Sequence, residues 1–245
     1  MVSNFKNIEK DLKQLANKEK ALILQRFFKT GPGEYGEGDI FLGIQVPESR
    51  KIAVKYKAAP LTDITRLLIS KIHEYRLVGF LILVSKYENA KTELERREIF
   101  DFYLENSHAA NNWDLVDLSA PKVIGHFLFN YYKKNKERPL DLLKKLAASE
   151  NLWEKRIAII STFYFIYQGK TKETFLIAKI LLNDKHDLIH KAVGWMLREV
   201  GKRVSREELI IFLNTHLKNM PRTTLRYAIE HLPEKQRKAY LDCRF

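Results

Sequence analysis

One short segment of the chain places an aromatic ring and a carboxylate at a spacing that could do chemistry. Trp113 and Asp117 lie four residues apart in NNWDLVDLSAPK (111–122). Residues four apart share one face of a helix, so both side chains would point the same way. The segment gives Asp117 no basic residue three or four positions away. Such a carboxylate is either structural, capping a distant group, or available for electrostatic or acid–base work.

A second segment combines an aromatic ring with cations. In DLIHKAVGWMLREVGK (187–202), Lys191, Trp195, Arg198 and Lys202 recur at helical steps of four, three and four. A separate apolar stripe runs through the same segment at Ile189, Val193, Met196, Leu197 and Val200. Cations for phosphate and a flat ring for sugar or base are what a nucleic-acid surface needs. The alternative is a tryptophan that covers the core at a repeat junction.

Three cations recur at a fixed interval. Arg156, Lys191 and Arg226 are 35 residues apart, and each begins a similar stretch: RIAI, KAVG and RYAI. A period of this length with two helices per unit is typical of a HEAT-like α-solenoid, against the alternative of a non-repetitive helical bundle. In a solenoid these cations would line a concave basic groove and follow a phosphate backbone. Otherwise they form a solvated rim.

The three tryptophans also recur at intervals close to the repeat length. Trp113, Trp153 and Trp195 are separated by 40 and 42 residues. In a repeat array these intervals bring them to one region of neighbouring units. One aspartate, one arginine and two or three tryptophans could then converge on a single site in the groove.

Helical periodicity recurs along almost the whole chain, which predicts an all-α fold of antiparallel helix pairs. We expect helices over 4–15, 18–29, 47–58, 61–73, 76–88, 92–106, 113–132, 138–148, 151–168, 171–183, 187–202, 205–217, 221–231 and 233–242. The glycine-rich segment GPGEYGEG (31–38) is the one obvious long loop, and no Asn-Gly or Asp-Gly hairpin signal occurs. We interpret 1–245 as one HEAT-like repeat domain.

Composition narrows the class of protein. The chain has 245 residues, of which 45% are hydrophobic, which suits one large domain or a repeat array with a real core. The 43 Lys and Arg against 30 Asp and Glu leave a net charge of +13, which favours a polyanionic partner, nucleic acid before a membrane surface. A merely basic protein is the alternative. The N-terminus lacks an apolar signal core, so we expect a cytoplasmic protein, associated with the nucleoid when bound to DNA.

Metal and cofactor chemistry find little support. Cys243 is the single cysteine, which excludes a disulfide framework and a cysteine zinc cluster. His186 and His190 are four residues apart with no third ligand signal nearby, which predicts a surface pair. No P-loop and no Gly-x-Ser-x-Gly motif occurs. We therefore expect neither a metal nor an organic cofactor.

Four stretches resemble the AlkD family of bacterial DNA alkylation repair glycosylases, in the family's order and spacing. They are FLGIQVPESR (41–50), NNWDLVD (111–117), NLWEKRIAI (151–159) and KAVGWMLRE (191–199), and the resemblance covers nearly the whole chain. It implies a HEAT-like solenoid that acts, as a monomer, on duplex DNA containing alkylated purines. The reaction it implies is excision of cationic 3-methyladenine and 7-methylguanine, without drawing the base into a deep pocket.

The resemblance also implies roles for individual residues. The matches are Asp117 for the catalytic aspartate, Trp113 and Trp195 for two tryptophans that contact the deoxyribose, Arg156 for an active-site arginine, and Gln45 and Arg50 for groove residues that contact DNA. Lys191, Arg198, Lys202 and Arg226 are predicted DNA contacts beside them. Two departures concern lesion preference: Asn112 replaces the family's usual aromatic residue, and the loop 31–38 is longer than expected.

Two rival functions remain open at this point. One is a catalytically silent HEAT-like protein that binds damaged or branched DNA, against which the presence of Asp117 argues. The other is a protein-interaction scaffold, the commonest use of α-solenoids, against which the net charge of +13 argues.

Overall fold

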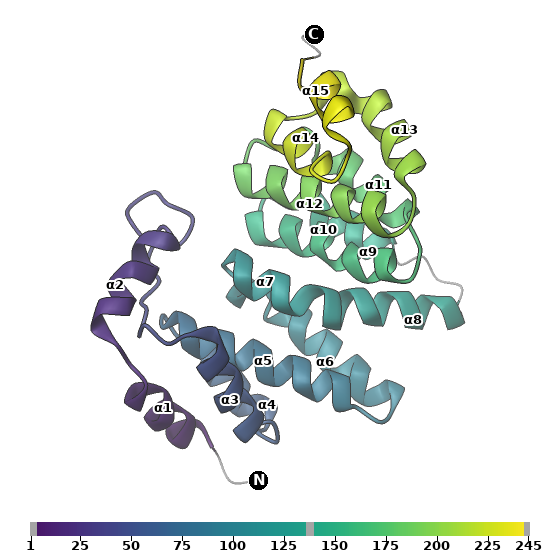
Figure 1. Cartoon of the computed structure of the whole chain (residues 1–245). Helices are drawn as coiled ribbons and strands as arrows, with labels where there is room; N and C mark the ends of the chain where they lie inside the picture. The colour runs from purple at the N-terminus through teal and green to yellow at the C-terminus, as the bar shows by residue number, and fades with distance from the viewer. Residues whose placement is uncertain (1–3, 136–139, 243–245) are drawn as a thin grey trace. The chain divides into compact units, whose positions relative to one another are not determined.

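The structure, a computed structural model, describes residues 4–135 and 140–242 and confirms the all-α prediction (Figure 1). Within these ranges the only β-type pairing is one isolated parallel bridge between Ile40 and Ile72. The chain divides into two compact units, residues 1–119 and 120–245, which are considered in turn. Among the residues described, no helix has the length and apolar character needed to cross a membrane.

Unit 1 is organised around one buried helix. Its elements are α1 (Phe5–Gln14), α2 (Lys18–Phe27), α3 (Val46–Lys55), α4 (Leu61–Leu68), α5 (His73–Asn89), α6 (Glu93–Glu105), the 3₁₀ turn η1 (Ser107–Ala109) and α7 (Trp113–Ala120). Helix α5 contacts α3, α4 and α6, and its residues 73–84 are all buried. A helix enclosed on all sides must be apolar around its circumference or satisfy its polar groups inside. The first turn of α5 satisfies its polar groups inside the unit, and this turn forms part of the candidate site.

Unit 2 is a stack of helix pairs. It contains the π-helical turn η2 (Pro121–Gly125), α8 (His126–Asn135), α9 (Leu140–Ala147), α10 (Leu152–Tyr167), α11 (Lys172–Leu181), α12 (Asp187–Arg203), α13 (Arg206–His216), the 3₁₀ turn η3 (Leu217–Asn219), α14 (Arg222–Ala228) and α15 (Glu234–Asp242). Helices α10, α12 and α14 pack in one layer, and α9 packs on α11 in the other. Each second helix of a pair therefore contacts the next second helix, an arrangement consistent with an α-solenoid.

The 35-residue period is confirmed in unit 2. Arg156, Lys191 and Arg226 lie on α10, α12 and α14, and each is the fifth residue of its helix. The sequence interval therefore reports equivalent positions on successive second helices.

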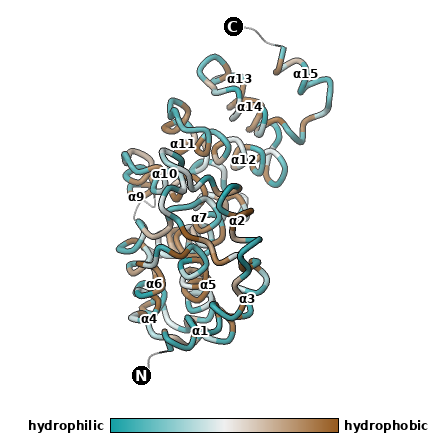
Figure 2. The backbone as a smooth tube through the Cα atoms, turned by 90° about the vertical axis from the view of Figure 1, so that its left-hand side faces the viewer, coloured by the Kyte–Doolittle hydropathy of each residue, from teal (hydrophilic) through white to brown (hydrophobic). Residues whose placement is uncertain are grey.

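Local sequence signals set the starts of the helices. The Asn17 side chain accepts a hydrogen bond at the start of α2, Asn151 does so for α10, and Ser205 for α13. Thr92 and Glu95 form a reciprocal capping box on α6. Each such cap satisfies an orphan N–H of the first turn and stabilises its helix by about 1 kcal/mol. Figure 2 shows apolar and polar residues alternating along the helices, as amphipathic helices require.

One predicted helix is wrong in extent, and a second contains a turn that the sequence does not predict. The sequence predicts one helix over 61–73, whereas α4 ends at Leu68 and α5 begins at His73. Residues between them follow a different path because the Ile40 N–H donates to the Lys71 carbonyl and the His73 N–H donates to the Ile40 carbonyl. The residue before α5, Ile72, is therefore extended rather than helical.

The other difference lies at Pro121. The sequence predicts a single helix over 113–132, whereas α7 passes through the π-helical turn η2 into α8. Proline has no N–H to donate, and widening to a π turn accommodates the lost bond. The start of the helix predicted over 138–148 lies outside the described residues, and α9 is described from Leu140.

The close approach of α12 and α14 depends on Gly194. A Cβ atom added there would lie 2.6 Å from the Thr224 carbonyl oxygen and 2.5 Å from the Tyr227 Cβ. We expect Gly194→Ala to lower the free energy of unfolding by about 1–3 kcal/mol because the crowded atoms are backbone or close to it. Gly201→Ala, on the same helix, meets the side chain of Leu209, which can move, and should cost less. Urea unfolding of both variants checks this, and equal losses would contradict it.

Candidate active site

Helix α7 carries both residues of the first motif. Trp113 is its first residue and Asp117 lies one turn later, and both are half-buried. The opposite side of the helix is fixed in the core by Leu115 and Val116, which are fully buried. The side-chain Oδ1 of Asn112 accepts the Trp113 N–H at 2.8 Å, so the departure at this position helps to cap α7.

The indole of Trp113 is held by an aromatic stack. It lies parallel to Phe28, with ring centroids 5.2 Å apart and planes at 15°. Phe28 stacks in turn on Phe41, with centroids 5.0 Å apart, and Phe41 stacks on the imidazole of His73 at 4.5 Å. Phe27 meets the indole from its edge at 6.0 Å. Stacking of this kind leaves the Trp113 ring little freedom to rotate.

A buried ion cluster lies at the other end of the stack. The His73 Nε2 lies 2.9 Å from the Asp114 carboxylate, and its Nδ1 lies 3.3 Å from the Asp39 carboxylate. The Arg76 guanidinium lies 2.6 Å from Asp39. The His73, Arg76 and Asp39 side chains are each at most 4% exposed, so these charges must compensate one another.

The cluster keeps His73 protonated. Burial lowers the pKa of His73, but the hydrogen bonds to Asp114 and Asp39 outweigh burial and raise the pKa to about 9. Burial likewise raises the pKa of Asp39, yet the hydrogen bond from His73 and the charge of Arg76 hold that pKa below its usual value. Near pH 7 the ring is therefore an imidazolium that donates from both nitrogens.

Glu74, the next residue of α5, organises the segment that leads into α3. Its carboxylate, 1% exposed, accepts the backbone N–H groups of Leu42, Gly43 and Ile44 at 2.8–3.1 Å. Gly43 has φ +81°, and a Cβ there would lie 2.1 Å from the Asn17 carbonyl oxygen, so the turn requires glycine. The segment delivers Gln45, exposed, to the start of α3.

A cavity of about 610 Å³ opens beside these groups. Its apolar lining comes from Ile23, Leu24, Phe28, Phe41, Gly43, Ile44, Val46, Pro47 and Leu77. Its polar lining comes from Lys20, Gln45, His73, Glu74 and Asp114. Helix α2, which forms one wall, buries none of its residues. The cavity therefore adjoins both the ion cluster and the predicted DNA contact Gln45.

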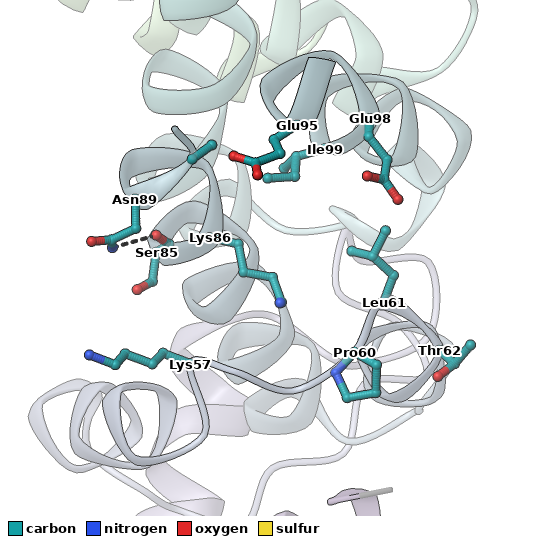
Figure 3. A pocket seen from close by; sticks show the side chains of 11 residues that line it. Lys57, Pro60, Leu61, Thr62, Ser85, Lys86, Asn89, Glu95, Glu98 and Ile99 are labelled. Atoms are coloured by element: carbon teal, nitrogen blue, oxygen red, sulfur yellow. Dashed lines mark hydrogen bonds between the residues drawn. The ribbon is translucent and has the colours of Figure 1, made fainter. Parts of the chain in front are cut away.

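A second cavity of about 560 Å³ lies among α4, α5 and α6 (Figure 3). It contains none of the residues predicted for the site. Its Glu95 carboxylate accepts the N–H groups of Lys91 and Thr92 as part of the α6 cap, which lowers the pKa of Glu95. This carboxylate serves the helix start, and we do not assign the cavity to the site.

The glycine-rich loop uses its own carboxylates. Residues 31–36 spell Gly-x-Gly-x-x-Gly, the glycine spacing of a dinucleotide-binding loop. The Gly31 N–H donates to Glu34 and the Gly33 N–H donates to Glu37, both at 2.9 Å. The loop follows helix α2 rather than a strand, so the structural context of a nucleotide site is missing.

In unit 2, α10 and α12 carry the other two residues of the predicted constellation. Arg156 is 5% exposed, and its guanidinium donates to the Leu188 carbonyl in the first turn of α12 at 2.8 Å. Trp195 is half-buried, with its ring 6.1 Å from that of Phe163, and Arg203 lies over the same phenylalanine at 5.4 Å. Trp153, the third tryptophan, is only 8% exposed and belongs to the core.

The remaining predicted contacts differ in how free they are. Arg50, Lys202 and Arg226 are exposed. Lys191 pairs with Asp187 at 2.7 Å, and Arg198 pairs with Glu230. The exposed pair of Lys191 contributes little free energy, so a phosphate can displace it, whereas the Arg198 side chain is 19% exposed and also lies 3.5 Å from the Glu199 carboxylate.

The predicted histidine pair has structural partners. The His186 ring accepts the Leu188 N–H at the start of α12, and the His190 Nε2 lies 2.6 Å from the Asp184 carbonyl oxygen. Each ring therefore serves the entry to α12.

The structure thus brings together Trp113 and Asp117 on α7, and Lys191, Trp195, Arg198 and Lys202 on α12. The first pair belongs to unit 1 and the second set to unit 2, and their convergence stays a prediction. Sequence reasoning missed the residues that hold Trp113, namely Phe28, Phe41, Asp39, His73 and Asp114. Asp114 stands inside the WD motif, but its partner lies 41 residues away and no local pattern joins them.

Comparisons with known proteins define the class. The family model described as DNA alkylation repair enzyme matches residues 8–232. The chain therefore belongs to the DNA alkylation repair enzyme family, and DNA is the partner that this family implies. No curated protein sequence gives a significant match.

A solved structure shows the same fold. The chain is similar to a protein titled predicted DNA alkylation repair enzyme from Enterococcus faecalis, with a TM-score of 0.67 and 16% identity. The match covers 89% of this chain and 97% of the other. At this identity the likeness speaks for the fold alone.

The ion cluster makes stability depend on pH. The pKa of His73 rises from 6.5 to about 9 on folding, so its contribution is complete below pH 6.5 and is lost as pH rises through 9. We expect the free energy of unfolding to fall by roughly 3 kcal/mol over this range in the wild type but not in His73→Gln. Urea titrations at pH 6.5–9.5 measure this, with His216→Gln as the control. If the free energy of unfolding changes with pH in the same way in the wild type and in His73→Gln, His73 is not the source of the pH dependence.

Proposed function

We propose that the chain is a DNA glycosylase of the AlkD type, which hydrolyses the N-glycosidic bond of cationic N3- or N7-alkylated purines in duplex DNA. The substrates are 3-methyladenine and 7-methylguanine, and the products are the free base and an abasic site. The observation that carries the proposal is the pair Trp113 and Asp117, one turn apart and partly exposed on α7, in a member of the DNA alkylation repair enzyme family.

The proposed reaction needs one carboxylate. An N3- or N7-alkylated purine already carries a positive charge and leaves without protonation, so the second carboxylate of ordinary glycosidases is not needed. Positive charge develops on the deoxyribose as the bond breaks. Asp117 stabilises that charge and positions or deprotonates the attacking water. Water is the co-substrate, and the chemistry calls for no metal or organic cofactor.

Trp113 and Trp195 pack their indoles against the deoxyribose and the cationic lesion. A cation over an indole ring gains about 0.5–2 kcal/mol, which favours charged lesions modestly over normal bases. The stack on Phe28 supports this role for Trp113, because a ring held at 5.2 Å from its neighbour loses little freedom on binding. The contact to Phe163 does the same for Trp195.

Five cations and the amide of Gln45 hold the backbone of the duplex along a concave basic groove. Gln45 and Arg50 serve from unit 1, and Lys191, Arg198, Lys202 and Arg226 serve from unit 2. The net charge of +13 and the equivalent positions of Lys191 and Arg226 on α12 and α14 support this arrangement. Arg156 is more buried than the others, and its bond to Leu188 fixes it for a role nearer the reaction than a phosphate contact. We propose that the protein acts as a monomer.

Asp117→Asn tests the catalytic assignment. The amide keeps the shape of the side chain and removes its charge, so base release from methylated duplex DNA should fall by about 10²–10⁴-fold. Duplex binding should persist. Asp101→Asn, which alters an exposed aspartate paired with Arg97, is the matched control and should keep full activity. Full release by Asp117→Asn would remove the assignment. Binding without release by the wild type would instead indicate a silent DNA-binding protein.

Salt dependence tests the groove. Each phosphate contact contributes about 0.9 to the slope of log affinity against log salt. Lys202→Gln and Arg226→Gln should therefore each reduce the slope for duplex DNA by about 0.9. Lys179→Gln, an exposed lysine on α11 in the other helix layer, is the control and should leave it unchanged. Fluorescence anisotropy at several salt concentrations gives the slopes. An equal reduction of the slope in the control and in both groove variants would refute the groove.

A further inference from the structure

We infer that His73 is a positioning residue for the reaction: clamped between Asp39 and Asp114, it fixes the start of α7 and the indole of Trp113. The role of Trp113 rests on the proposed function. The position of its ring does not, and it can be measured separately.

The first link between His73 and α7 is a hydrogen-bonded carboxylate. Asp114 is the second residue of α7, and its Oδ2 lies 2.9 Å from the His73 Nε2. Its Oδ1 accepts the backbone N–H of Leu115 at 2.9 Å. One carboxylate thus joins the first residue of α5 to the backbone of the helix that carries Trp113. Its side chain is only 15% exposed, so water competes weakly for the bond.

The second link is the stack of rings. The imidazole of His73 lies on Phe41 with planes at 19°, Phe41 lies on Phe28, and Phe28 lies on Trp113. An imidazolium over an aromatic face adds a cation–π attraction that a neutral ring lacks. A change at His73 therefore reaches Trp113 both through Asp114 and through the rings of Phe41 and Phe28, the second of which also lies 5.1 Å from the imidazole.

The charges around His73 make its second proton necessary for holding both carboxylates. Asp39 comes from the loop before Ile40, Asp114 from α7, and Arg76 and Glu74 from α5 itself. Glu74 is engaged with the N–H groups of residues 42–44, and Arg76 pairs with Asp39. Two carboxylates face the ring, and a neutral imidazole has one N–H for both. Loss of the proton removes the imidazole N–H from one of the two carboxylates, Asp39 keeping its pair with Arg76, and loosens the clamp.

Fluorine NMR tests the link directly. Protein labelled with 5-fluorotryptophan gives one signal for each of Trp113, Trp153 and Trp195, assigned by single Trp→Phe variants. We expect the Trp113 signal to move between pH 7 and 10 with a midpoint near 9, the pKa of His73. The signals of Trp153 and Trp195, which belong to unit 2, should not follow this midpoint. The transition should vanish in His73→Gln and persist in His216→Gln. A Trp113 signal that ignores the titration would overturn the inference.

Base release supplies the functional arm. His73→Gln should lower kcat on methylated duplex DNA by about tenfold or more, because a misplaced contact residue costs rate, while duplex affinity is unchanged. The wild type should lose kcat above pH 9, and the variant should lack that limb. Wild-type kcat in His73→Gln would refute the positioning role. Absence of release by the wild type would refute the proposed function instead, and the NMR result would still decide whether His73 positions Trp113.

Discussion

The imidazolium of His73 between two carboxylates is the interaction on which the arrangement of unit 1 depends. It joins three segments that are distant in sequence: the loop at Asp39, the first turn of α5, and the start of α7. Burying four charged groups is costly unless each is paired, and here each carboxylate has a cation at 3.3 Å or less. Asp39 keeps Arg76 if His73 is lost, whereas the Asp114 carboxylate then loses the imidazolium that joins α7 to α5.

Around this cluster the chain builds two kinds of support for the proposed chemistry. Unit 1 provides rigidity, since aromatic stacking and a three-fold carboxylate–amide contact at Glu74 hold Trp113 and Gln45. Unit 2 provides repetition, since second helices of successive pairs place cations at equivalent positions. A reaction whose leaving group is already cationic needs few chemical groups but needs them well placed. The rigid support in unit 1 and the repeated cations in unit 2 suit that requirement.

Much of the fold can be predicted from periodicity. The stripe through Ile189, Val193 and Met196 is buried as the sequence indicates, and the 35-residue interval marks successive second helices. The errors occur where a long-range or backbone effect decides. The pairing of Ile40 with Ile72 ends α4 early, and Pro121 widens a helix that the side-chain pattern reads as continuous.

The candidate site is predictable only in part, for a related reason. Trp113 and Asp117 stand out because residues four apart share one face of a helix, and their spacing is local. The partners of Trp113 follow from packing between α2, α5 and the loop at Phe41, which no local pattern encodes.

The most direct measurement of the central claim compares release of 7-methylguanine and of uracil from one duplex by the purified protein. The account predicts release of the cationic base and none of the neutral base. Equal release of both, or release of uracil alone, would contradict it.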